Sequence, residues 1–149
     1  MPGQSASRLN CEIKDYSVLS LFAGQTLNLG AEGVPETTTD MHATKGKREF
    51  EVYLRCGRKE GGFDFGCAIE GKFVFCEPIT ENNARLAWVN GCTILYGVMR
   101  NIYMTTSAQC IRKPLILPAA MMLDVVNRRI AELQAPAKPA KARTRKPKD

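Results

Sequence analysis

Several features that mark membrane or secreted proteins are missing from this chain of 149 residues. No stretch approaches the roughly 20 apolar residues that a helix needs to span a bilayer. The first ten residues are polar and contain no apolar run followed by a small-residue cleavage site, which argues against a secretory signal. We therefore expect a cytoplasmic protein.

Residues suited to catalysis or metal binding are also scarce. His42 is the only histidine, and it lies in a polar stretch where a solvated side chain is its expected role. No two of the six cysteines form a CxxC pair, so no structural zinc site is expected. The glycines between residues 57 and 71 do not lead from a strand into a helix, as a phosphate-binding loop requires. The sequence predicts no enzyme, no metal, no cofactor and six reduced thiols that serve mostly as core residues.

The net charge of +6 is concentrated at one end of the chain. Between Pro136 and Asp149 there are six basic residues and one acid, so this tail carries +5 and the other 135 residues only +1. Its Ala, Pro, Lys and Arg composition cannot pack a core, so we expect one domain over residues 1–135 and a disordered basic tail over 136–149. The tail either keeps the chain soluble or contacts phosphates or an acidic protein.

Alternating apolar and polar residues predict strands in the first half of the chain. Residues 9–22 alternate with a break in phase near Asp15, which is typical of a β-bulge. Residues 48–58 alternate without a break, and a glycine turn joins them to a second long strand over 63–77. One short strand is expected before them, over either 26–29 or 37–43.

Helical patterns fill the second half. Thr80 can cap a short helix over 81–89, and Asn90 with Gly91 is expected to separate it from a long helix over 92–109. The apolar residues of the long helix cover an arc of about 200°, twice the stripe of about 100° that a surface helix needs. A second helix or a second subunit must therefore cover part of this arc.

A last helix is expected up to Leu133, with Pro118 in its first turn. Strands first and helices last predict an α+β domain, in which an antiparallel sheet carries helices on one face.

Four segments of the chain resemble the SecB family of protein-export chaperones. They are Ile13–Ser17, Phe50–Arg55, Cys92–Arg100 and Pro114–Pro118. Each pattern alone is ordinary for a core, but the four follow the family's order and spacing over about residues 8–133. The resemblance implies a four-stranded antiparallel sheet backed by a long helix and a C-terminal helix. It also implies a homotetramer, a dimer of dimers packed through the long helix.

The implied activity is that of an ATP-independent holdase, which binds unfolded polypeptides in an exposed apolar groove for protein export. Burial of apolar surface supplies the affinity in such a groove. The client-binding candidates by position are Phe63, Phe65, Phe73, Phe75, Trp88 and Leu115. An ordinary core role is the alternative for each of them. The candidates for the oligomer interface are Leu95, Val98, Met99, Ile102 and Tyr103.

Two departures from the family pattern leave other functions open. The family's export members are usually acidic and dock to the SecA motor through an acidic sheet surface, whereas the body of this chain is near neutral and its tail is basic. The chain could instead serve one dedicated client, such as the antitoxin of a toxin–antitoxin pair. It could also associate with nucleic acid through its tail, in which case binding would depend strongly on salt.

Overall fold

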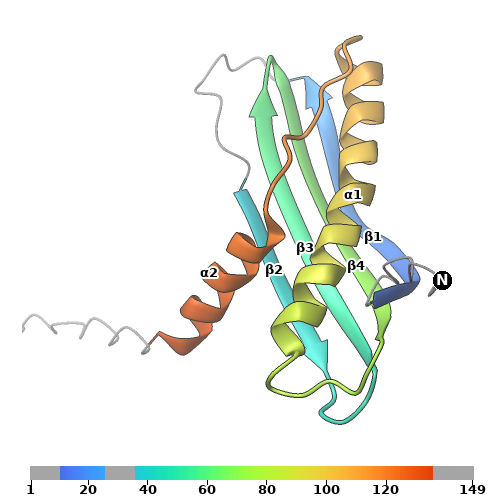
Figure 1. The fold of residues 1–149 in the computed structure, drawn as a ribbon. Helices are drawn as coiled ribbons and strands as arrows, with labels where there is room; N and C mark the ends of the chain where they lie inside the picture. The colour runs from blue at the N-terminus through green and yellow to red at the C-terminus, as the bar shows by residue number, and fades with distance from the viewer. Residues whose placement is uncertain (1–10, 26–35, 136–149) are drawn as a thin grey trace, which may run out of the picture.

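The computed structural model describes residues 11–25 and 36–135, which form a four-stranded antiparallel sheet with two helices on one face (Figure 1). The elements are β1 (Cys11–Gln25), β2 (Glu36–Ala43), β3 (Glu49–Glu60), β4 (Phe63–Phe75), α1 (Ala84–Cys110) and α2 (Met122–Gln134). The strand order is β1-β4-β3-β2, so β1 and β2 are the edges of the sheet. The expected α+β fold, with helices on one face of an antiparallel sheet, is confirmed.

The edge strands show where the sequence patterns were informative. The pairing of β1 with β4 shifts register between Ile13 and Asp15, which confirms the expected bulge, and shifts again between Val18 and Ser20. The short strand that precedes β3 is β2, so the expectation over 37–43 is confirmed. The alternative segment, 26–29, lies outside the described residues.

Helix α1 is continuous over 27 residues, so the expected break at Asn90 and Gly91 is wrong. Gly91 faces the sheet, and a Cβ atom there would lie 2.7 Å from Cγ2 of Val52. The glycine is therefore needed for close packing of α1 on β3. The N-cap is Asn83 rather than Thr80, and Asn83 Oδ1 accepts a hydrogen bond of 2.7 Å from the Thr80 backbone N–H.

The segment between the helices, residues 111–121, is called the link here. It has no regular secondary structure, and α2 begins only at Met122, so the expected start near Pro118 is wrong. Three hydrogen bonds hold the link against α1: Tyr96 Oη to Pro118 O (2.6 Å), Arg100 Nε to Leu117 O (3.1 Å) and Leu115 N to Ser107 Oγ (2.8 Å). They align the link with α1, so that Leu115 and Leu117 are buried while Ile116 between them is exposed.

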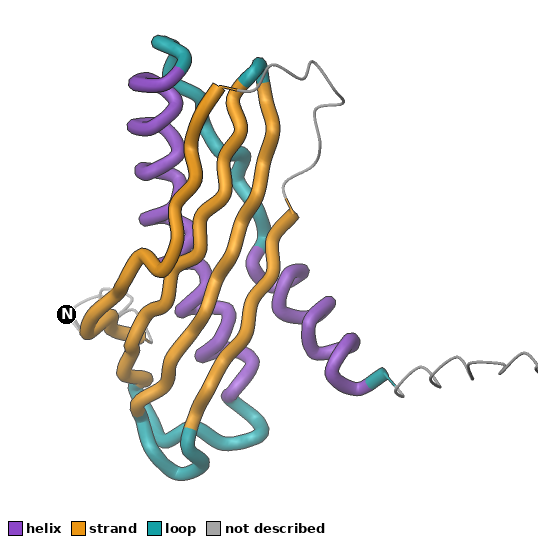
Figure 2. Tube along the Cα trace, turned by 180° about the vertical axis from the view of Figure 1, so that it is seen from behind, coloured by secondary structure: helices purple, strands orange, loops and turns teal. Residues whose placement is uncertain are grey.

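The core lies between the sheet and α1. Its largest fully buried side chains include Phe63, Phe65, Phe73, Phe75, Leu54, Ile69, Leu95, Met99 and Tyr103. Phe65 and Tyr103 meet edge to face with ring centroids 4.9 Å apart. Figure 2 shows the sheet from the other side, where no described helix covers it.

Helix α2 covers edge strand β2, and this contact is smaller than that of α1 with the sheet. Met122 and Val126 are its buried residues. Arg128 Nη2 donates to Thr37 O and Arg129 Nε pairs with Asp40 Oδ1, each at 2.8 Å. No helix in the described parts of the chain is long and apolar enough to cross a membrane.

Candidate functional site

All six residues expected to bind clients are buried. Their exposed fractions are 0% for Phe63, 2% for Phe65, 1% for Phe73 and Phe75, 7% for Trp88 and 8% for Leu115. The four phenylalanines point from β4 toward α1, and they form the centre of the core. The expectation that these side chains line an open groove is therefore wrong for this conformation.

Trp88 was expected near a gap between two helices, and the continuity of α1 removes that gap. Its Nε1 instead donates a hydrogen bond of 3.0 Å to Oγ1 of Thr39. The same hydroxyl donates to Tyr53 O at 2.7 Å and lies 3.1 Å from Sγ of Cys92. One buried hydroxyl thus ties α1 to β2 and β3.

The expected interface residues on α1 divide into two groups. Leu95, Met99 and Tyr103 have no exposed surface because they pack against the sheet, so they are not available to a second subunit. Val98 and Ile102 are half-buried beside the core. The sequence could not separate these groups, because the apolar residues cover about 200° of the helix and their pattern does not indicate which of them face the sheet.

The outer side of α1 is nearly free of charge. Arg85 and Arg100 are the only charged residues in the 27-residue helix, and Arg100 is bonded to the link. Leu86 is 49% exposed and Met104 is 42% exposed. The other exposed residues between them are Thr93, Gly97 and Asn101. A surface helix normally carries charged residues on its solvent side, so this side has the composition of a contact surface.

A second apolar surface, called the β1 strip here, lies along the edge strand β1. Its five residues are 43–60% exposed: Tyr16, Val18, Leu19, Leu21 and Phe22. Tyr16, Val18 and Leu21 pair with Gly71, Ile69 and Cys67, which places their side chains on the helix-bearing face of the sheet. Edge strands usually carry charges or prolines that prevent pairing with another chain. The β1 strip lacks both, and the run of large apolar residues around the second bulge is a sequence signal that was missed.

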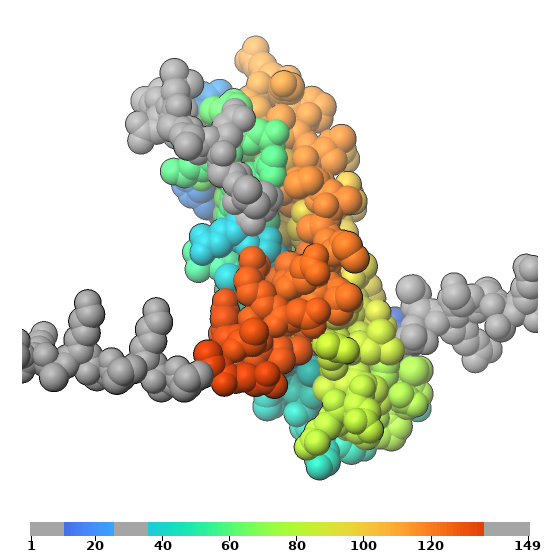
Figure 3. Space-filling view, turned by 60° about the vertical axis from the view of Figure 1, so that its left-hand side comes forward, coloured from blue at the N-terminus to red at the C-terminus, as the bar shows by residue number. Residues whose placement is uncertain are grey.

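A third apolar surface, called the link surface here, consists of Ile116, Met121 and Leu123. Their exposed fractions are 65%, 68% and 40%. The space-filling view shows the link and α2 together on one side of the molecule (Figure 3). The candidate Leu115 is therefore one position away from an exposed apolar residue, Ile116.

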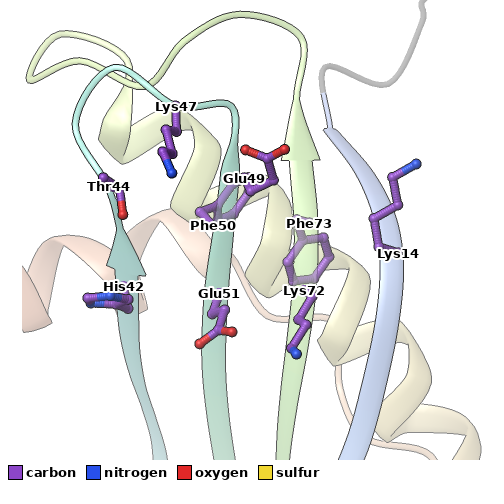
Figure 4. A pocket seen from close by; sticks show the side chains of 9 residues that line it. All are labelled: Lys14, His42, Thr44, Lys47, Glu49, Phe50, Glu51, Lys72 and Phe73. Carbon is purple, nitrogen blue, oxygen red and sulfur yellow. The ribbon is translucent and has the colours of Figure 1, made fainter.

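The uncovered face of the sheet is polar apart from Phe22 on the edge strand β1, which pairs with Gly66 and is 60% exposed. Near the ends of the strands it has an open depression with a volume of about 490 Å³ (Figure 4). The charged and polar side chains around it are Lys14, His42, Thr44, Lys47, Glu49, Glu51 and Lys72. Glu49 and Glu51 lie on β3, whereas Lys72 and Lys14 lie on β4 and β1, so both signs of charge are present and the depression does not select one sign of ligand. No group of three His, Cys, Asp or Glu residues in the described ranges could hold a metal ion.

Although the net charge of residues 1–135 is close to zero, acidic and basic residues lie on different faces of the domain. Strand pairing assigns eight acids to the uncovered face of the sheet: Glu12, Asp15, Glu36, Asp40, Glu49, Glu51, Asp64 and Glu70. The basic residues there are Lys14, Lys47, Arg55, Lys59 and Lys72. Over α1, the link and α2 the balance reverses, with six basic residues and two acids. The net charge of the body therefore does not describe either face.

Four of the six cysteines are buried and serve as packing residues. Burial raises the pKa of Cys11, Cys67 and Cys92 to about 11, and burial also raises the pKa of Cys56. These thiols stay protonated near neutral pH, and the protonated form is a poor nucleophile. Cys76 is exposed and Cys110 is half-buried.

Comparison with known proteins gives a fold but no sequence relative. No family model and no curated protein matches the chain. The SecB-like chaperone Rv1957 of Mycobacterium tuberculosis, solved with a ChAD peptide from the Rv1956 HigA1 antitoxin, aligns with a TM-score of 0.56 and 18% identity. The alignment covers 74% of this chain and 91% of that one. A protein of unknown function from Streptococcus agalactiae aligns with a TM-score of 0.57 and 12% identity, over 73% of this chain and 97% of its own. The chain thus has a divergent form of the SecB-like chaperone fold.

Proposed function

We propose that this protein is a cytoplasmic chaperone that holds unfolded segments of other polypeptides without using nucleotide. The link surface carries the proposal, because Ile116 and Met121 are about two-thirds exposed on a SecB-like fold. Exposure of such side chains to water is energetically unfavourable for a monomer. Clusters of exposed apolar residues therefore mark binding sites. The peptide bound to the Mycobacterium tuberculosis chaperone supports a polypeptide as the ligand.

The chemistry of the link surface suits clients of varied sequence. Methionine is flexible and polarisable, so it adapts to different partner side chains, and loop-rich surfaces serve binders of low specificity. Burying the exposed parts of these three side chains, which are 65%, 68% and 40% exposed, contributes about 3–5 kcal/mol. Ordering the client and losing its translational freedom offset much of this. Weak, reversible binding is the expected result, as holding an unfolded chain requires.

The test is suppression of the aggregation of a chemically unfolded polypeptide, followed by light scattering without nucleotide. We expect the wild-type protein to suppress aggregation and the double variant Ile116→Asp, Met121→Asp to lose most of this activity. Leu133→Asp is the matched control, because Leu133 is 61% exposed on α2 but lies outside the link surface. Equal suppression by the double variant and the control would remove the link surface as the site.

A chaperone for one dedicated client is the second candidate. The ligand of the Mycobacterium tuberculosis chaperone is a peptide from a single antitoxin. A dedicated chaperone would not suppress the aggregation of an unrelated polypeptide, but it would copurify with one polypeptide and protect it from proteolysis. The two assays together separate these candidates.

A role in export adds the requirement of docking to the SecA motor. The uncovered sheet face, with its excess of acids, is the available surface for a basic partner. Binding of SecA to the purified protein, weakened by added salt, is the expected observation for an export chaperone.

We also propose that copies of the chain assemble, with a tetramer as the final state. The β1 strip and the uncharged side of α1 are the supporting surfaces. An edge strand with exposed apolar side chains can pair with a second strand through its backbone, and the strip would then be covered.

A further inference from the structure

The two faces of the domain differ in charge, and the basic tail complements only one of them. Over α1, the link and α2 there are six basic residues and two acids, so these elements disfavour a basic segment. The uncovered sheet face has eight acids and five basic residues, which leaves a net charge of −3. The tail, residues 136–149, carries +5. Charge complementarity therefore pairs the tail with the uncovered sheet face.

The composition of the tail points to the same face. The tail consists of Ala, Pro, Thr, Lys, Arg and Asp, without any large aliphatic or aromatic residue. It therefore has little apolar area with which to cover the link surface or the β1 strip. The uncovered sheet face instead offers charged groups that lack partners. Among the described residues, no basic group forms an ion pair with Glu49, Glu51 or Glu70.

The strand register brings acids of three strands close together. Asp40 of β2 and Glu70 of β4 both lie directly opposite Tyr53 of β3. Glu51 is two residues from Tyr53 on the same strand, so Asp40 and Glu70 are its diagonal neighbours. Such neighbours lie about 7–8 Å apart across antiparallel strands. A basic segment that crosses the sheet from β2 toward β4 would meet these three carboxylates in turn.

The tail begins near the β2 edge of this face. Arg129 of α2 pairs with Asp40 at 2.8 Å, and Figure 2 shows α2 beside β2. From Arg129 the helix continues to Gln134, which is about 8 Å at 1.5 Å per residue. Fourteen extended residues reach up to about 46 Å, whereas four strands about 4.8 Å apart span about 14 Å. The tail can therefore cross the whole sheet while attached to α2.

We propose that the tail docks on the uncovered sheet face of its own chain and shields the acids there from basic partners. A tethered segment has an effective concentration in the mM range, so the weak ion pairs of an exposed surface suffice to hold it. The open depression beside Glu49 and Glu51 has room for a long basic side chain (Figure 4). A SecA motor that docks on this face would have to displace the tail. The inference concerns a different face from the link surface and does not depend on client binding.

The test is cross-linking of the full-length chain with a carbodiimide, which joins a lysine amine to a carboxylate only where the two are in contact. We expect mass spectrometry to find tail lysines joined to Glu51 or Glu70 at low salt. These cross-links should disappear in about 1 M salt, where the Debye length is about 3 Å. A mixture of ¹⁵N-labelled and unlabelled protein separates contacts within one chain from contacts between chains. Tail lysines that join only Glu132, or only the sheet of another chain, would overturn the proposal.

A basic probe tests the shielding. A fluorescent peptide of ten lysines is titrated into the wild type and into a full-length variant with glutamine in place of the six basic residues of the tail. We expect the variant to bind the probe roughly ten-fold more tightly, because no tethered segment competes. This gain should shrink in the background Glu51→Gln, Glu70→Gln and persist in the matched background Asp124→Asn, Glu132→Gln, which changes the net charge equally. An equal gain in both backgrounds, or no gain at all, would contradict docking of the tail on the sheet.

Discussion

The missing side chain at position 91 determines how closely α1 approaches the sheet. Replacing Gly91 with alanine places a methyl group 2.7 Å from Val52 Cγ2, and a β-branched valine in a strand has little freedom to move. Overpacking of this kind costs about 1–3 kcal/mol, against a gain in helix propensity of about 1 kcal/mol. We predict that Gly91→Ala lowers the free energy of unfolding by up to about 2 kcal/mol, as measured by urea denaturation.

The same substitution at position 97 is the control for Gly91→Ala. The gain in helix propensity is the same, but no neighbour in the described part of the chain is close enough to clash. At concentrations where the chain is monomeric, Gly97→Ala should therefore stabilise the fold. Equal effects of the two substitutions would contradict the role assigned to Gly91.

The link shows, at the scale of one residue, what the sequence could and could not predict about the site. An apolar, exposed position was expected at Leu115, but the exposed residue is its neighbour Ile116. The sequence shows that the link is apolar. Which side chains point outward depends on the hydrogen bonds from Tyr96, Arg100 and Ser107, which fix the link against α1. These are long-range contacts, and local patterns do not encode them.

At the scale of elements, one hydroxyl group joins β2, β3 and α1. Thr39 accepts a hydrogen bond from Trp88, donates one to the Tyr53 carbonyl and contacts the Cys92 thiol. Thr39→Val keeps the shape but leaves the buried Trp88 N–H and the Tyr53 carbonyl without this partner. The penalty for unpaired buried groups is about 1–3 kcal/mol. We predict a loss of this size in the free energy of unfolding, together with a changed Trp88 emission spectrum.

Thr38 provides the control for this prediction. It is the preceding residue on β2, but it is exposed and points to the opposite face of the sheet. Thr38→Val should change the free energy of unfolding by less than about 0.5 kcal/mol. A loss for Thr39→Val no larger than this would mean that the hydroxyl does not stabilise the contact between α1 and the sheet.

The elements themselves were predictable to different degrees. Alternation predicted the strands and the first bulge because strand periodicity follows directly from which face is buried. The helix boundaries failed at Gly91 and Pro118, where a residue that often ends or starts a helix has another role. Gly91 serves a tertiary contact, and Pro118 accepts a hydrogen bond from Tyr96 through its carbonyl. Residue preferences alone do not distinguish these roles.

At the scale of the whole molecule, the residues expected to line a groove are buried, and other apolar residues are exposed instead. The phenylalanines of β4 are needed to fill the core, and the exposed apolar area lies on the β1 strip, the outer side of α1 and the link surface. The first two offer regular backbone geometry and fixed shapes, which suit assembly of identical chains. The link surface is irregular and suits variable clients. Assembly and client binding can therefore use separate parts of one small domain.

The β1 strip gives the prediction that tests this division. Leu21 is 48% exposed and pairs with Cys67, so its side chain lies on the helix-bearing face of the sheet at the open edge. Leu21→Lys leaves the charge in water in a single chain but places it inside the interface of an assembly, where it lacks a partner. We expect the dissociation constant to rise roughly ten-fold, equivalent to about 1.4 kcal/mol.

Ser20→Lys is the matched control for Leu21→Lys, because Ser20 pairs with Ala68 and faces the uncovered side of the sheet. Binding of one copy to another also makes the midpoint of thermal unfolding rise with protein concentration. This rise should persist in Ser20→Lys and weaken in Leu21→Lys, while suppression of client aggregation per chain stays similar in both variants. Loss of client holding in Leu21→Lys, with assembly intact, would instead place the clients on β1 and reverse the roles of the two surfaces.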